Sequence, residues 1–136
     1  MIDLKSLRLG NILKDHKGRL REVAYITECV GFKNDIGGVD KYQKDPITSY
    51  DIETLSYVDL SEDILLKCEG MKKEPSEKCE YFIQIAKRTH IVINLNEGID
   101  VGLALEDDFL YVECDYLHEL QNLIKSLTNK ELIINF

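Results

Sequence analysis

Short apolar stretches separated by polar residues recur along most of this chain and predict strands. Four of them follow one another in the second half of the chain, at residues 81–86, 90–95, 99–105 and 109–114. Only short polar turns separate them, and short strands joined by short turns pair antiparallel. We therefore expect a C-terminal antiparallel meander.

The first half also reads as strands joined by hairpin turns. Residues 12–14 and 52–60 have strand patterns, and the β-branched and aromatic residues of 20–32 indicate one long, bent strand. Residues 15–18 form a predicted hairpin turn in which Gly18 can take a positive φ. Residues 34–38 predict a second turn. This half is expected to form barrel-like hairpins.

Two segments have helical character. Residues 116–127 place six apolar side chains within about 120° of arc at 100° per residue, which predicts an amphipathic helix that packs on the sheet. Asp115 is its candidate N-cap and Asn129 its expected end, followed by a strand at 132–134. Ser61 is the candidate N-cap of a shorter helix that Gly70 would end. The predicted fold class is α+β, with mostly antiparallel strands, one short helix and one longer amphipathic helix.

Length and composition indicate one domain over residues 1–136, with a possible internal joint near 71–78. A chain of 136 residues with 44% apolar residues can bury a hydrophobic core without disulfides or metal. It has no apolar run of the ~18 residues that a membrane-spanning helix needs, and its first residues lack the pattern of a secretion signal. We expect a cytoplasmic protein that does not enter membranes.

The charge is negative and uneven. The net charge is -8, and residues 89–136 carry two basic residues against nine acidic ones. Such an acidic half disfavours direct nucleic-acid binding, where neutralised phosphates supply the affinity. It suits a partner protein with a basic surface, and the alternative is that the charge serves solubility alone.

Motif searches favour binding over catalysis. The four cysteines have no close-spaced pairs, no phosphate-binding glycine loop occurs, and no histidine has a motif-spaced partner. We expect no metal and no cofactor, and we read the cysteines as small buried hydrophobes.

Two low-specificity binding candidates remain. One is a polar helix face with His118, Asn122 and Lys125 at i, i+4 and i+7, and the other is the acidic turn Glu106, Asp107 and Asp108. The alternatives are a solvated helix face and a solvated turn. The tyrosines at 42, 50 and 57, which we expect to be exposed, also favour a binding function, because tyrosine is enriched at protein interfaces.

Three stretches carry a resemblance to a known family. Residues 7–11 (LRLGN), 60–68 (LSEDILLKC) and 116–123 (YLHELQNL), in this order and spacing, resemble a family of small proteins of Bacteroidetes and their phages and prophages. The chain departs from the family pattern at 57–59, where the family has prolines, and in a longer central segment at 40–56. The resemblance implies an accessory protein of a phage or mobile element, with no reaction, cofactor or active site to transfer.

Together these features lead to a hypothesis and an alternative. The hypothesis is a non-catalytic protein-binding accessory protein of phage or mobile-element origin, acting on a host or phage protein with a basic surface. In its narrower form, the chain is an acidic inhibitor of a bacterial defence nuclease. The alternative is a protein that binds or sequesters a small ligand such as a nucleotide, in a pocket between sheet and helix near His118, Asn122 and Lys125. An enzyme with an unrecognised site is a third possibility.

Overall fold

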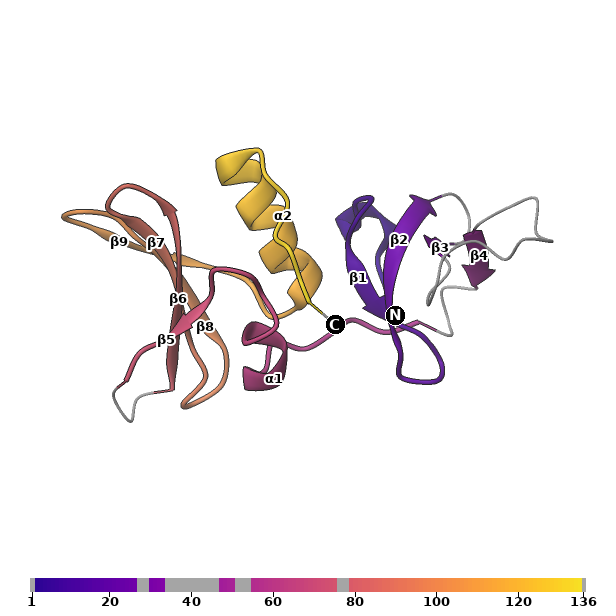
Figure 1. The fold of residues 1–136 in the computed structure, drawn as a ribbon, viewed down its shortest axis with the longest axis horizontal. Helices are drawn as coiled ribbons and strands as arrows, with labels where there is room; N and C mark the ends of the chain where they lie inside the picture. Colours follow the sequence, from indigo (N-terminus) through magenta and orange to yellow (C-terminus); the bar gives the residue numbers. More distant parts are fainter. Residues whose placement is uncertain (1, 27–29, 34–46, 51–54, 76–78, 136) are drawn as a thin grey trace. The chain divides into compact units, whose positions relative to one another are not determined.

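The structure is a computed structural model that describes residues 2–26, 30–33, 47–50, 55–75 and 79–135 (Figure 1). The chain divides into two compact units, Met1–Val58 and Asp59–Phe136. Each unit has its own antiparallel sheet. The segment 71–78, the expected joint, belongs to the second unit, whereas the boundary lies between Val58 and Asp59.

The described part of the first unit consists of a 3₁₀ turn and four strands in the sheet order β1-β2-β3-β4. These elements are η1 (Leu4–Ser6), β1 (Ile12–Lys14), β2 (Leu20–Ile26), β3 (Val30–Lys33) and β4 (Ile47–Tyr50). A small apolar core holds them together, formed by the buried side chains of Ile2, Leu13, Val23 and Leu55. Tyr57 packs against this core and its hydroxyl accepts a hydrogen bond from the Asp3 N–H at 2.8 Å. Tyr57 is therefore part of the packing of this unit.

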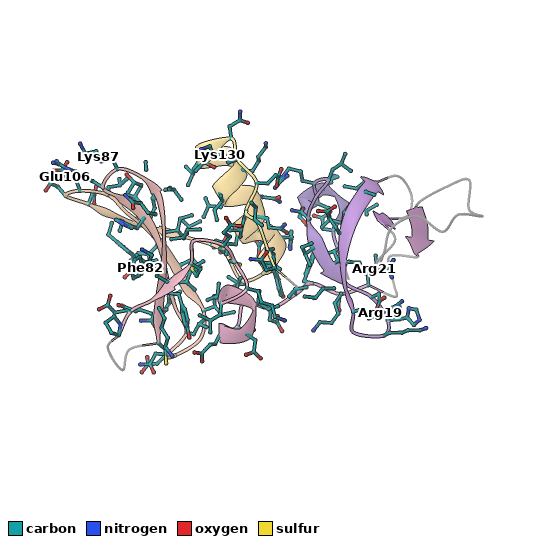
Figure 2. The ribbon with its side chains drawn as sticks, viewed as in Figure 1. Arg19, Arg21, Phe82, Lys87, Glu106 and Lys130 are labelled. Carbon is teal, nitrogen blue, oxygen red and sulfur yellow. The ribbon has the colours of Figure 1, made fainter. Side chains whose placement is uncertain are left out.

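The β1–β2 hairpin turns around the carboxylate of Asp15, as the sequence predicts for residues 15–18. Asp15 Oδ1 accepts hydrogen bonds from the backbone N–H groups of Lys17 and Arg19, both at 2.9 Å, and Gly18 has a φ of +77°. Asp15 Oδ2 accepts from Arg19 Nε at 2.9 Å and lies 3.5 Å from Arg21 Nη1 (Figure 2). Burial alone would raise the pKa of Asp15, but the hydrogen bonds from Arg19 and Lys17 outweigh it and lower that pKa.

Two strand predictions for this unit are wrong. Residues 20–32 form not one bent strand but two, because β2 and β3 pair antiparallel and the chain reverses between them. β-branched residues favour extended backbone without specifying where it reverses. The described part of 52–60 forms only isolated bridges, such as Lys14 with Ser56, and the strand of this region is β4. The predicted turn at 34–38 lies outside the described residues.

The second unit contains two helices and a five-stranded sheet in the order β5-β6-β7-β8-β9. Its elements are α1 (Glu62–Leu65), β5 (Lys72–Lys73), β6 (Glu80–Ala86), β7 (Thr89–Asn94), β8 (Asp100–Ala104), β9 (Phe109–Val112) and α2 (Leu117–Thr128). The four-stranded meander is confirmed, and so is the α+β class with mostly antiparallel strands. The two-residue strand β5 lies within residues 71–78, the segment expected to be a joint.

Helix α2 packs on one face of this sheet, against β6, as predicted (Figure 1). We call this side of the sheet the inner face. Side chains on it are paired across the strands by the register Tyr81–Ile93–Val101 and Ile83–Ile91. All five of these side chains are buried. On the helix, Leu117, Leu120 and Ile124 are buried too. The sheet and α2 therefore share one apolar core.

The ends of the helices agree only in part with the sequence prediction. Ser61 Oγ accepts a hydrogen bond from the Ile64 N–H at 3.4 Å and caps α1 as expected, but α1 ends at Leu65, well before Gly70. The N-cap of α2 is Tyr116 and not Asp115. The Glu119 carboxylate explains the shift, because its Oε1 accepts the N–H groups of both Asp115 (3.1 Å) and Tyr116 (3.2 Å).

The end of the chain follows the prediction at one point and departs from it at another. Asn129 has a φ of 58° and ends α2 as predicted. Residues 132–134 do not form a strand, since Ile134 makes only an isolated bridge with Cys68. No helix in the described part of the chain is both long and apolar enough to cross a membrane.

Candidate functional site

The helix-face candidate differs from its prediction. His118 does not project into solvent, because it is buried with only 2% of its surface exposed. The covered side of α2 carries His118 and Gln121 together with Leu117, Leu120 and Ile124, whereas Leu127 is 46% exposed. The buried side of α2 is thus rotated away from the centre of the apolar stripe predicted for residues 116–127 and toward Gln121. The rotation explains why a face that looked polar in the sequence is partly buried.

The three residues of that candidate face have different environments. Burial lowers the pKa of His118, although the nearby Glu119 carboxylate acts in the opposite direction, so the imidazole is neutral at pH 7. Its ring stacks on Tyr116 with 6.1 Å between centroids. Lys125 Nζ donates to the Asn129 carbonyl at 3.2 Å and stabilises the end of α2. Asn122 is half-buried. The structure does not bring these three side chains together as one exposed patch.

The acidic turn lies where the sequence places it, between β8 and β9. Glu106 forms an ion pair with Arg88, and Asp108 Oδ1 accepts the Phe109 N–H at 2.8 Å. Asp107 is exposed. Among the described residues, no three His, Cys, Asp or Glu side chains are grouped so that they could hold a metal ion.

Two cysteines behave as the sequence predicts. Cys68 and Cys114 are buried, and burial raises the pKa of Cys68 to about 11 and that of Cys114 to about 12. Thiols react as thiolates, so both are chemically inert at neutral pH. Cys79 is only half-buried, so the prediction is wrong for this residue, and Cys29 lies outside the described residues.

The most distinctive surface of the second unit is the side of the sheet that faces away from α2, which we call the outer face. Figure 2 shows Phe82 on this side. The strand register aligns Phe82, Val92, Gly102 and Tyr111 in one row across β6–β9, and Gln84, His90, Ala104 and Phe109 in the next. No helix among the described residues covers these rows (Figure 1). A sheet face with this many aromatic side chains and no layer above it is a candidate interaction surface.

The aromatic side chains of the outer face contact one another in pairs. Phe82 and His90 meet edge to face with 6.0 Å between centroids, and Phe109 and Tyr111 do so at 5.1 Å. The Phe109 ring lies against Gly102, where a Cβ atom would come within 2.8 Å of Phe109 Cε2. Glycine at this position therefore lets the ring lie flat on the strand.

A shallow cavity opens on the same face. It measures about 290 Å³ and is lined by Glu74, Glu80, Tyr81, Phe82, His90, Val92 and Ala104. The lining combines apolar side chains, such as those of Phe82 and Val92, with the carboxylates of Glu74 and Glu80. A cavity of this composition can receive an apolar side chain that carries a basic group at its tip.

Strand β9 forms one edge of the sheet and is exposed on both of its faces. Phe109 and Tyr111 belong to the outer face and are 43% and 84% exposed, while Leu110 belongs to the inner face and is still 49% exposed. Acidic residues precede and follow the strand, with Asp107 and Asp108 before it and Glu113 and Asp115 after it. All four are exposed.

The sequence contains a signal for this surface. A strand with one solvated face alternates apolar and polar residues, whereas a strand covered on both faces is continuously apolar. Residues 109–112 (FLYV) and 91–93 (IVI) are continuously apolar. Counting apolar residues on both faces of each strand would have identified a second apolar surface besides the one that α2 covers.

A larger cleft of about 530 Å³ lies beside the C-terminal end of α2. Its lining includes Ile83 and Ile85 of β6, Ile124 and Leu127 of α2, and Lys130, whose position Figure 2 shows. None of His118, Asn122 and Lys125, around which a ligand pocket was expected, lines this cleft.

Comparison of the chain with protein-family models, with curated proteins and with solved structures gave no match in any of the three.

Proposed function

We propose that this chain is a protein-binding protein whose partner docks on the outer face of the β5–β9 sheet. The observation that carries the proposal is the pair Phe109 and Tyr111, two aromatic residues of the outer face that contact each other and are 43% and 84% exposed. Single exposed apolar residues are common, but contiguous ones on an uncovered sheet face are typical of interaction sites. Aromatic residues are also enriched at the centres of protein interfaces.

Charge supports a partner with a basic surface. Residues 89–136, which include β7 to β9 and α2, carry two basic residues against nine acidic ones. Opposite charge on a partner would speed the encounter and fix its orientation. A basic nucleic-acid groove, as in a bacterial defence nuclease of the host, is one such surface, and Asp107 and Asp108 would occupy phosphate positions there. The acidity supports this narrower proposal, and the resemblance alone supports a phage or mobile-element origin.

A capture experiment with matched variants tests the proposal. The tagged chain, the double variant Phe82→Ala/Tyr111→Ala and the control Leu66→Ala are incubated with lysate of the organism that encodes the chain. Leu66 is 55% exposed, follows α1 and lies outside the outer face, so it controls for loss of an exposed apolar side chain. We expect one protein to be retained by the wild type and the control but lost with the double variant.

Two results would contradict the proposal. One is that every captured protein binds the double variant as well as it binds the wild type. The other is that Leu66→Ala weakens binding as much as the double variant does. Circular dichroism of the three proteins shows beforehand that each is folded.

The cleft beside α2 favours small-ligand binding as a second candidate. Its volume of about 530 Å³ lies within the range of ligand sites, and Lys130 could bind an anionic group such as a phosphate. A thermal-shift screen of nucleotides against the wild type, Lys130→Ala and Lys125→Ala tests it. We expect stabilisation that Lys130→Ala removes and Lys125→Ala keeps, because Lys125 does not line the cleft.

A further inference from the structure

We propose that the outer edge of β9 accepts an extended segment of the partner as a sixth strand, and that this segment is apolar in its middle and basic at both ends. The inference rests on the proposed protein-binding function, because it names what the partner contributes at the same surface. Three observations carry it: the direction of the backbone groups of β9, the exposure of its side chains, and the acids at both of its ends.

The hairpin between β8 and β9 determines which backbone groups of β9 point to the edge of the sheet. The Leu105 N–H donates to the Asp108 carbonyl at 2.9 Å, so residues 105 and 108 are a hydrogen-bonded pair. In an antiparallel ladder, hydrogen-bonded and non-hydrogen-bonded pairs alternate. The register Ala104–Phe109, Leu103–Leu110 and Gly102–Tyr111 then makes Phe109 and Tyr111 members of non-hydrogen-bonded pairs.

The backbone groups of Phe109 and Tyr111 consequently point away from β8, toward the edge of the sheet. The Phe109 N–H is already bound by Asp108 Oδ1 at 2.8 Å. The Phe109 carbonyl and both backbone groups of Tyr111 are thus directed outward, and among the described residues no strand pairs with this edge. An added strand would bind these three groups.

The side chains of β9 define the middle of the added strand. Tyr111 on the outer face and Leu110 on the inner face are 84% and 49% exposed, so apolar side chains of the added strand would have apolar neighbours on both faces. Edge strands that avoid such pairing carry lysine, proline or a bulge. Strand β9 (FLYV) has no lysine or proline, and its register with β8 runs without a shift.

The charges at the ends of β9 select the occupant. Asp107 and Asp108 precede the strand and Glu113 and Asp115 follow it, so basic residues at both ends of the added segment would each meet acids in either strand direction. A second copy of this chain is a poor occupant for the same reason. Antiparallel pairing of two β9 strands through the outward-pointing Phe109 and Tyr111 would place Asp107 of each copy opposite Glu113 of the other.

A synthetic probe tests the inference directly. It is a fluorescein-labelled nonapeptide with two lysines at each end and five alternating valines and threonines between them. We expect it to bind the full chain at 50 mM salt and to dissociate as the salt concentration rises. Two control peptides should lose at least about tenfold in affinity: one with glutamates in place of the lysines, and one whose three central amides are N-methylated and cannot donate hydrogen bonds.

Two substitutions of the same residue separate the edge from the face. Tyr111→Pro removes an N–H that takes no part in the ladder with β8, so the sheet tolerates it while the added strand loses a donor. Tyr111→Ala removes the aromatic ring and keeps the N–H. We expect Tyr111→Pro to bind the peptide about tenfold more weakly than Tyr111→Ala does, with unchanged circular dichroism for both.

Failure of this inference differs from failure of the proposed function. If Tyr111→Pro and Tyr111→Ala bind the peptide equally, or the N-methylated peptide binds as well as its parent, strand addition is overturned. The outer face remains the docking surface if Phe82→Ala/Tyr111→Ala still loses the captured partner. A dimer in analytical ultracentrifugation that Tyr111→Pro dissociates would also overturn the inference, because the occupant would then be a second copy.

Discussion

Replacing Gly102 by alanine tests how the outer face is packed, because a Cβ atom there would come within 2.8 Å of Phe109 Cε2 and closer still to Cε1 and Cζ. Real Cβ atoms do not approach a ring carbon this closely, so the Phe109 ring has to leave its position on β8. The ring can do so because Phe109 is 43% exposed. The variant is therefore expected to fold with a rearranged outer face.

The size of the effect follows from two opposing contributions. Complete burial of a phenylalanine side chain stabilises a protein by about 1.5–3 kcal/mol. Phe109 is a little more than half covered, so displacing it should cost about 1–1.5 kcal/mol. Alanine is in turn about 0.5–1 kcal/mol more favourable than glycine inside a strand. The net destabilisation of Gly102→Ala should be small, about 0.5 kcal/mol.

A double-mutant cycle makes this small net effect measurable. In a Phe109→Ala background there is no ring to displace, so Gly102→Ala should stabilise the protein by about 0.5–1 kcal/mol. The coupling between the two positions should be about 1–1.5 kcal/mol, measured by urea denaturation followed by circular dichroism. If the two substitutions are additive within about 0.5 kcal/mol, Phe109 does not lie on Gly102 and the geometry of the outer face is wrong.

Three further predictions concern stability and reactivity. Asp15→Ala should lower the free energy of unfolding by about 2–3 kcal/mol, because it leaves the buried Arg21 without the Asp15 carboxylate. In the same urea titration, the exposed control Asp107→Ala should change the free energy of unfolding by less than about 0.5 kcal/mol. Because the pKa of His118 is lowered in the folded state, the unfolded chain takes up a proton first as pH falls below about 6.5. Stability should therefore decrease from pH 7 toward pH 5.5, by at most ~1.4 kcal/mol per pH unit from this residue, and His118→Gln should flatten that slope; an unchanged slope would contradict the assignment. Cys68 and Cys114, with pKa values of about 11 and 12, should resist a thiol reagent at pH 8 until the protein is unfolded, and rapid labelling of the folded protein would show that they are accessible.

Local signals predicted the elements whose causes are local. The hairpin at residues 15–18 forms because Asp15 binds backbone groups two and four residues further along, and α1 begins at Ser61 because its hydroxyl accepts an N–H three residues later. The meander strands follow from short apolar runs and short turns. Each of these features depends on residues that are close in the sequence, and periodicity detects such residues.

The features that sequence reasoning missed depend on long-range packing. The apolar stripe of α2 predicts a helix that packs on a sheet, but the covered side also includes His118 and Gln121, and no periodicity encodes this rotation. The reversal between β2 and β3 has no glycine or proline signal at 27–29. The predicted site residues are polar, whereas the surface that stands out in the structure is apolar. Only Glu106, Asp107 and Asp108 adjoin it, at the start of β9.

Folding alone does not account for the composition of β9. Tyrosine and phenylalanine have high strand propensity, which is the simplest reason to find them in an edge strand. Threonine and valine would satisfy that propensity equally well. Hydrophobic stabilisation grows with the apolar area that leaves water, so Tyr111, at 84% exposure, gains little of it. The fully buried Ile91 and Ile93 of the inner face belong to β7, which pairs with β6 and β8 and not with β9. Tyr111→Ala should therefore leave the free energy of unfolding within about 0.5 kcal/mol of the wild type while it weakens partner binding, and a large loss of stability would show that the ring serves the fold.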